Sequence, residues 1–149
     1  MKKFLFHFMG SNMHYIIFII TLFLLQKYTT VFLFYCIGFI ISTCINICLK
    51  LIIQQPRPIA SYEYQNSFTQ KYGMPSGHSQ FCGFSLVYIC LHQKTFTSYM
   101  VYSILSFITL LQRFVSQNHT LLQIVVGFII GCFIGYTCHL FVVRYLENK

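Results

Sequence analysis

Aspartate is absent from this chain of 149 residues, and glutamate occurs only twice, at Glu63 and Glu147. Paired-metal carboxylate sites, EF-hands, aspartyl nucleophiles and Ser-His-Asp triads all need aspartate or several carboxylates, so the sequence excludes these classes. A glycosidase needs two carboxylates beside one sugar bond, and Glu147 lies at the extreme C-terminus. Any chemistry of this protein must therefore use other side chains.

Charge of either sign is scarce as well. Charged residues make up 8% of the chain, whereas a soluble domain has about 25%. Hydrophobic residues make up 56% and the mean hydropathy is +0.66, so polar groups cannot cover a water-facing surface. We therefore expect a membrane protein whose length is enough for one domain and hardly for two.

Apolar stretches without charge mark the expected membrane spans. Every backbone polar group in hydrocarbon must be hydrogen-bonded internally, so these stretches are expected to be helices. The sequence thus predicts an all-α fold, a polytopic transmembrane helical bundle that forms one membrane-embedded domain over residues 1–149. The five spans are predicted at about 11–26, 28–49, 77–93, 95–112 and 120–143, with a long polar loop at 51–75. The first and third are short for a bilayer, which needs about 20 residues.

The few charges are mostly basic, because ten Lys and Arg face two acids and give a net charge of +8. If the spans alternate in direction, one membrane face gathers Lys50, Arg57, Ser76, Gly77, His78, Arg113 and His119. Cations at a membrane interface are costly unless they meet an anion, and phosphate oxygens match arginine well. Helix N-termini at this face would add backbone N–H donors. Each cation alone fits ordinary positive-inside charge, but together with two histidines they predict a site for lipid phosphate. No basic run or groove-reading motif indicates nucleic-acid binding.

Histidine can supply the chemistry that the missing carboxylates do not. A neutral imidazole can attack phosphorus, and a protonated one can give its proton to the leaving oxygen, without a metal or cofactor. His119 precedes a helix whose dipole disfavours the imidazolium, and Gln123 lies one turn further on the same face. We expect Gln123 to accept a hydrogen bond from Nδ1–H of His119, and His78 to be the general acid. Interface or packing roles are expected for His7, His14, His92 and His139.

Cysteine and glycine both indicate packing. The seven cysteines lie in apolar stretches without metal-type spacing. Gly127, Gly131 and Gly135 recur every four residues and share a helix face, where small residues let helices approach closely. This face predicts a packing seam, either within the chain or in a homodimer.

Three motifs, in order along the chain, resemble the signatures of the type 2 phosphatidic acid phosphatase superfamily. They are K-x6-R-P at 50–58, P-S-G-H at 75–78 and R-x5-H at 113–119. The segment 71–81 is most similar to the second motif of dolichyl diphosphatases. The resemblance implies a helical bundle that hydrolyses a polyprenyl diphosphate through a phosphohistidine without metal, in the endoplasmic reticulum with its site facing the lumen. It implies a nucleophile at His119, a general acid at His78, and phosphate binding by Lys50, Arg57, Ser76, Gly77 and Arg113.

Two positions depart from the superfamily pattern. Gln112 stands where a serine opens the third motif, and Gln123 stands where an aspartate usually follows the histidine. A neutral amide stabilises an imidazolium less than a carboxylate does, although dolichyl diphosphatases are similar in carrying glutamine there. Alternatives therefore stay open. The substrate could be another lipid phosphate (phosphatidate, undecaprenyl diphosphate or farnesyl diphosphate), the protein could be a degenerate binder of lipid phosphate, or paired histidines could hold haem.

Overall fold

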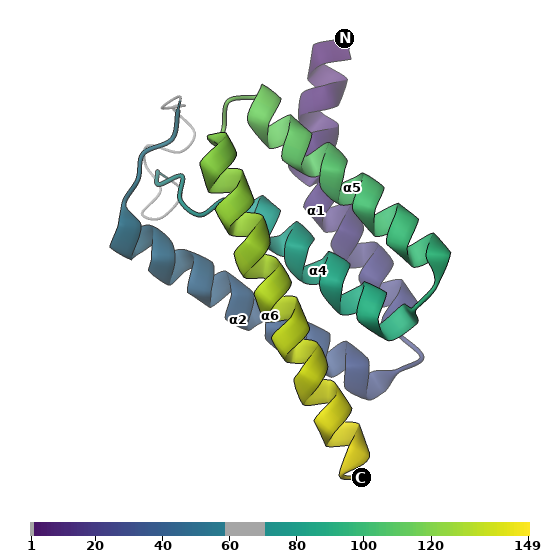
Figure 1. Cartoon of the computed structure of the whole chain (residues 1–149). Helices are drawn as coiled ribbons and strands as arrows, with labels where there is room; N and C mark the ends of the chain where they lie inside the picture. Colours follow the sequence, from purple (N-terminus) through teal and green to yellow (C-terminus); the bar gives the residue numbers. More distant parts are fainter. Residues whose placement is uncertain (1, 59–70) are drawn as a thin grey trace.

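The computed structural model describes residues 2–58 and 71–149, with side chains from residue 12 onward, and these residues form five α-helices (Figure 1). Each predicted span corresponds to one helix, and the all-α prediction is confirmed. Within the described residues, extended pairing is limited to an isolated bridge between Pro56 and Tyr72. The helices are α1 (Lys2–Leu25), α2 (Thr29–Ile53), α4 (Gly77–Gln93), α5 (Phe96–Val115) and α6 (Leu121–Glu147).

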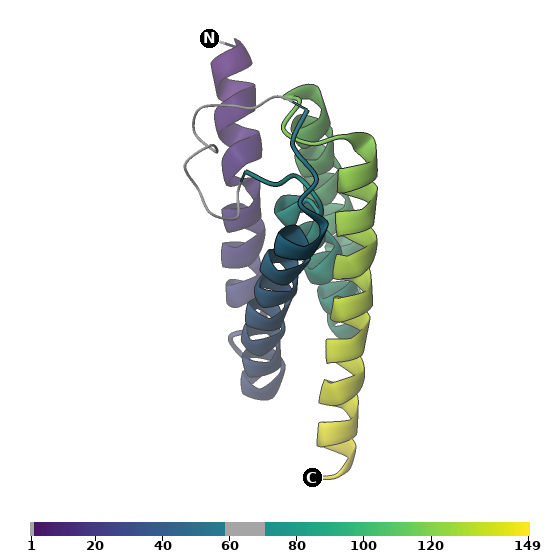
Figure 2. The same ribbon diagram turned by 90° about the vertical axis from the view of Figure 1, so that its left-hand side faces the viewer.

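Helix α4 lies at the centre of the bundle and contacts all four other helices. Figure 2 shows α1 and α6 on opposite sides of the molecule, with α2 in front of α4. Most of the 17 residues of α4 are buried, including Ser79, Gln80 and Ser85. Because its neighbours shield it, this helix can be short and can carry polar side chains that a lipid-facing helix could not.

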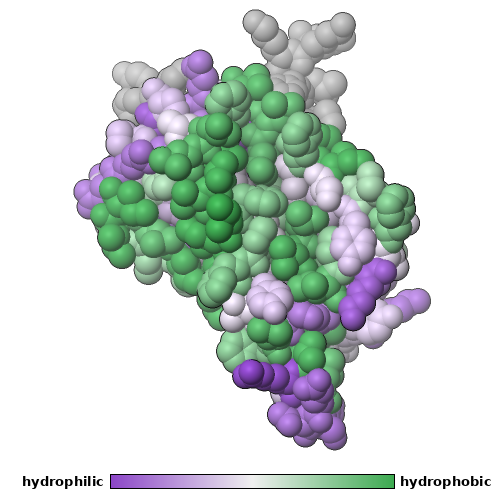
Figure 3. All heavy atoms as spheres, viewed as in Figure 1, coloured by the Kyte–Doolittle hydropathy of each residue, from purple (hydrophilic) through white to green (hydrophobic). Residues whose placement is uncertain are grey.

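The outside of the bundle matches a membrane environment. Helices α2, α5 and α6 are long and apolar enough to cross a bilayer, and Asn12–Leu25 of α1 forms a shorter apolar helix. Figure 3 shows hydrophobic side chains over the middle of one face and hydrophilic ones toward its two ends. The chain is therefore a multi-pass membrane protein. The predicted first and third spans, which were expected to be short, correspond to α1 and α4.

The glycines of α6 form a seam against α4 within the same chain. A Cβ atom on Gly127 would lie 2.5 Å from the carbonyl oxygen of Ser76, and one on Gly135 would lie 2.6 Å from that of Phe84. A Cβ on Gly131 would overlap the carbonyl oxygen of Gln80. Since α4 covers this face, a homodimer through these glycines is not compatible with the fold.

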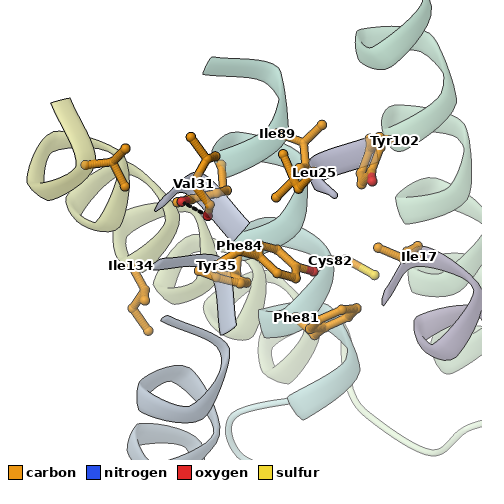
Figure 4. Close-up of a cluster of buried hydrophobic side chains, with 12 residues drawn as sticks. Ile17, Leu25, Val31, Tyr35, Phe81, Cys82, Phe84, Ile89, Tyr102 and Ile134 are labelled. Atoms are coloured by element: carbon orange, nitrogen blue, oxygen red, sulfur yellow. Dashed lines mark hydrogen bonds between the residues drawn. The ribbon is translucent and has the colours of Figure 1, made fainter. Parts of the chain in front are cut away.

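Aromatic rings fix α2 on α4 in the core (Figure 4). The rings of Tyr35 and Phe84 stack with centroids 5.1 Å apart. The three tyrosine hydroxyls in this cluster have partners: Tyr35 pairs with Ser85 at 2.8 Å, Tyr88 donates to the Val31 carbonyl at 2.7 Å, and Tyr102 pairs with Thr21 at 2.6 Å. This packing sets the position of the C-terminal end of α2 relative to the N-terminal end of α4, where the predicted motifs lie.

Candidate active site

The loop between α2 and α4 is closed at its base. Gln54 caps the C-terminal end of helix α2; it has a φ of 50° and donates its N–H to the Lys50 carbonyl. Beyond it, the N–H of Gly73 donates to the Gln55 carbonyl at 2.7 Å. Residues 59–70, with Glu63 among them, lie outside the described residues. The closed base brings the first predicted motif beside the second.

The imidazole of His119 is held from both sides and is 2% exposed. Its Nδ1 lies 2.9 Å from the carbonyl oxygen of Gly73, and its Nε2 lies 3.1 Å from Nη1 of Arg57. A carbonyl can only accept and a guanidinium can only donate, so Nδ1 carries the proton and Nε2 presents its lone pair. Arg57 also donates to the Asn118 carbonyl at 3.1 Å. The ring is thus neutral, and the Nε2 lone pair accepts a hydrogen bond from a cation.

The charges around His119 reinforce this state. Burial, followed by the positive charges of Arg57, Lys50 and Arg113, lowers the pKa of His119 from its ordinary 6.5 to about 3, and the Gly73 carbonyl partly opposes the shift. Lys50 is 6% exposed and Arg113 is 2% exposed. Three cations surround this neutral imidazole: one from the end of α2, one from the end of α5 and one from the loop between α2 and α4. A binding site for an anion requires such an excess of positive charge.

Gln123 makes the predicted contact with His119 and has further partners. Its Oε1 lies 3.3 Å from Nδ1 of His119, further than the Gly73 carbonyl, and accepts from the backbone N–H of Thr120 at 3.1 Å in a capping box. Its Nε2 donates to the Pro56 carbonyl at 3.0 Å and to Oε1 of Gln55 at 3.1 Å. Gln123 thus ties the base of the loop to the start of α6, and the nearer acceptor for Nδ1 is a backbone carbonyl.

The second motif is held between α2 and α6. Ser76 is fully buried, and its N–H donates to the Gln123 carbonyl at 3.1 Å, so this N–H is already used within the protein. On the other side, Asn46 donates to Oε1 of Gln80 at 2.8 Å, and Gln80 donates to the Ser42 carbonyl at 2.7 Å. These amides lie one turn before Lys50 on α2 and one turn into α4. They fix the start of α4, which carries Gly77 and His78.

His78 lines a cavity of about 200 Å³ between α1, α2 and α4, whereas His119 lines a separate opening beside the start of α6. The ring of His78 contacts that of His14, with 4.2 Å between centroids. The packing contact expected for His14 is therefore made with a predicted site residue. His92 and His139, for which packing roles were also expected, contact each other at 3.1 Å between Nε2 and Nδ1 near the opposite end of the bundle.

Sequence reasoning missed four residues that shape this site, namely Gly73, Asn46, Gln80 and His14. Gly73 and Gln80 lie in the segment 71–81 that resembles the second motif, but that resemblance assigned them no role, and Asn46 and His14 lie outside all three motifs. The tight Gly77–Asn46 approach (a Cβ on Gly77 would lie 3.2 Å from Oδ1) becomes visible only in the fold. Gln112, the other departure in the third motif, is buried and donates to Oγ of Ser116 at 3.0 Å within the end of α5.

A helical membrane bundle with a buried histidine among cations is typical of one family of membrane proteins, which the family comparison names. The model of the PAP2 superfamily matches residues 30–147, and the chain belongs to this family. All the site residues from Lys50 to Gln123 fall within the match, and His14 falls before it.

Two curated proteins are similar to the chain. One is the "Dolichyldiphosphatase" of Saccharomyces cerevisiae, which is 35% identical over 112 residues, covering 66% of this chain and 46% of that protein. The other is the "Palmitoyl-protein thioesterase-dolichyl pyrophosphate phosphatase fusion 1" of Schizosaccharomyces pombe, 34% identical over 109 residues, covering 66% of this chain and 17% of that protein. The chain thus spans less than half the length of either relative. No solved structure matches the chain.

Proposed function

We propose that this protein is a metal-independent membrane phosphatase that hydrolyses a lipid diphosphate, with dolichyl diphosphate as the substrate and dolichyl phosphate as the product. The observation that carries the proposal is the neutral imidazole of His119, whose Nε2 lone pair faces Arg57 among three cations. The names of the two relatives support the choice of substrate. The active unit is the single membrane-embedded domain of residues 1–149.

The first chemical step transfers a phosphoryl group to His119. The terminal phosphate displaces the Arg57 guanidinium from Nε2 and is held by Arg57, Lys50 and Arg113. An Nε2–P bond forms as the bond between that phosphorus and the bridging oxygen breaks. The bridging oxygen leaves with the polyprenyl monophosphate and takes a proton from His78.

The second step regenerates the enzyme with water. A water molecule gives a proton to His78 while its oxygen attacks the phosphorus, and the Nε2–P bond breaks. Inorganic phosphate and neutral His119 result. Throughout, the Gly73 carbonyl accepts from Nδ1–H at 2.9 Å and keeps the ring in its orientation. In this proposal the carbonyl does the orienting work for which the superfamily commonly uses a carboxylate, so Gln123 is compatible with turnover.

The place of the site in the cell is part of the same proposal. The site lies at one end of the helices, so the phosphate head would sit at a membrane face while the isoprenoid tail stays among the apolar surfaces of the bilayer. We place the protein in the endoplasmic reticulum, with the site facing the lumen, in the supply of polyprenyl phosphate for protein glycosylation.

The test is phosphate release from dolichyl diphosphate by the purified chain in detergent with EDTA present. His119→Ala should lower the rate by about a thousandfold or more, as removal of a catalytic nucleophile does. The matched control is His139→Ala, which changes a histidine at the other end of the bundle and should leave the rate near that of the wild type. An unaffected His119→Ala variant would remove the nucleophile from the proposal, and loss of activity on chelation would remove its metal independence.

A panel of other lipids addresses the substrate. Phosphatidate, undecaprenyl diphosphate and farnesyl diphosphate share the phosphate head but differ in the tail. A clear preference for one of them would replace dolichyl diphosphate while keeping the mechanism. Binding of every lipid without phosphate release would instead favour a protein that only binds lipid phosphate.

A further inference from the structure

His14 and His78 form an edge-to-face pair of rings between α1 and α4. Their centroids are 4.2 Å apart and their planes meet at 77°. Both side chains line the same cavity of about 200 Å³, whose other walls are aromatic or uncharged polar residues from α2 and α4. Among the described residues that line this cavity, His14 is the only titratable side chain beside His78. It is therefore the group in this lining that can most directly restrict the His78 imidazole.

Helix α1 holds His14 in a defined place. Phe18 lies one turn further on the same face, and its ring contacts those of Phe39 at 5.2 Å and Phe81 at 6.4 Å. Phe39 and Phe81 contact each other at 5.4 Å and line the same cavity as His14. This aromatic group joins α1 to α2 and α4, so the position of the His14 ring is set by packing on either side of the cavity.

The side chain of His78 needs a neighbour that fixes its orientation. It is the second residue of α4, it is partly exposed, and it lies in the first helical turn beside an open cavity. A general acid acts only when its proton lies within hydrogen-bond reach of the leaving oxygen. A ring packed edge-on against the imidazole limits the rotamers that His78 can adopt.

We infer that His14 is a positioning residue for His78, whose ring contact holds the general acid in line with the leaving oxygen of the substrate. The inference rests on the proposed function, in which His78 protonates that oxygen. His14 lies before residues 30–147 that match the family, so the family match assigns it no role.

The kinetic test compares two leaving groups in the purified full chain. For dolichyl diphosphate, His14→Ala should lower kcat about tenfold with little change in KM, because a general acid contributes about 10²–10⁴-fold and its misplacement forfeits part of that. For p-nitrophenyl phosphate, whose nitrophenolate leaves without a proton, the loss should be less than about twofold. His14→Phe, which keeps a ring at this position, should recover most of the activity. In a His78→Ala background, His14→Ala should have no further effect.

Phe18→Ala is the matched control, since it loosens the same helix face without touching His78 and should not discriminate between the leaving groups. If His14→Ala does not fold, His14→Leu takes its place, because leucine fills similar space without a ring. Equal losses on both substrates, or no recovery in His14→Phe, would overturn the inference.

A second readout separates this inference from the proposed function. Ring nitrogen signals of His78, assigned in ¹⁵N-histidine-labelled protein in micelles, should shift or broaden in His14→Ala and return in His14→Phe. That result supports the contact whether or not the wild type hydrolyses any diphosphate. Unchanged His78 signals in His14→Ala overturn the inference even if the wild type is fully active.

Discussion

Gly73 allows the most direct test of the arrangement around His119. Its φ is not positive, so the position does not need glycine for its backbone conformation. It needs glycine for space, since an added Cβ would lie 2.5 Å from Oε1 and 2.6 Å from Nε2 of Gln123. Gly73→Ala therefore probes the contact between the loop and α6 that holds the Nδ1 acceptor.

The size of the effect follows from the contacts of Gln123. Its amide would have to move by about 0.9 Å to reach an ordinary contact of 3.4 Å. The amide cannot move freely, because it bonds to Thr120, Pro56 and Gln55. Either these bonds break or Gly73 moves away from His119. We expect a loss of about 1–3 kcal/mol in stability from overpacking, and about a hundredfold loss in kcat from a misplacement of roughly 1 Å.

The assay measures phosphate release from dolichyl diphosphate and thermal unfolding in detergent for four proteins: the wild type, Gly73→Ala, Gln123→Ala and the double variant. A small side chain at position 123 leaves room for the added methyl group. Gly73→Ala should therefore cost little more once Gln123 is already alanine. Full activity of Gly73→Ala, or an equal cost in both backgrounds, would refute the steric argument.

Three other substitutions test the cations, the imidazole and the helix seam. Arg57→Ala should lower kcat about a hundredfold or more, which is the cost of removing a donor to the transition state. Lys71→Ala, at an exposed lysine, should leave kcat unchanged. Similar rates for the two variants would contradict the role of Arg57 in binding the phosphate. Because the pKa of His119 is about 3 in the folded protein and 6.5 without burial, the unfolded chain takes up the proton first, and stability falls as the pH drops from about 6.5 toward 3. His119→Asn should thus lose less Tm than the wild type between pH 7 and 4, and parallel losses would count against the buried neutral ring. Gly131→Ala should destabilise the fold by about 1–3 kcal/mol or more. Thermal unfolding measures this, with Ile129→Ala on the exposed face of the same helix as the control. Equal Tm values for the two variants would show that α4 and α6 can move apart to accept the added methyl group.

Gln123 shows how sequence and structure divide the explanation. Its position four residues after His119 predicts an amide on the right helix face, and the structure has its oxygen 3.3 Å from Nδ1. The same amide also caps α6 and binds two residues of the loop. Only the folded loop brings these groups together, so the sequence predicted the contact with the ring but not the other partners of this amide.

The sequence by itself determined the membrane class, the helices and the set of cations and histidines at one end. These depend on composition, on apolar stretches that leave a chain no alternative in lipid, and on side-chain types with specific chemistry. Tertiary structure decided which carbonyl lies nearest to Nδ1 of His119. Every residue has a backbone carbonyl, and only packing brings that of Gly73 to this nitrogen. It likewise decided that the glycines of α6 face α4 and that His14 meets His78, because contacts between helices depend on how their faces are turned toward one another.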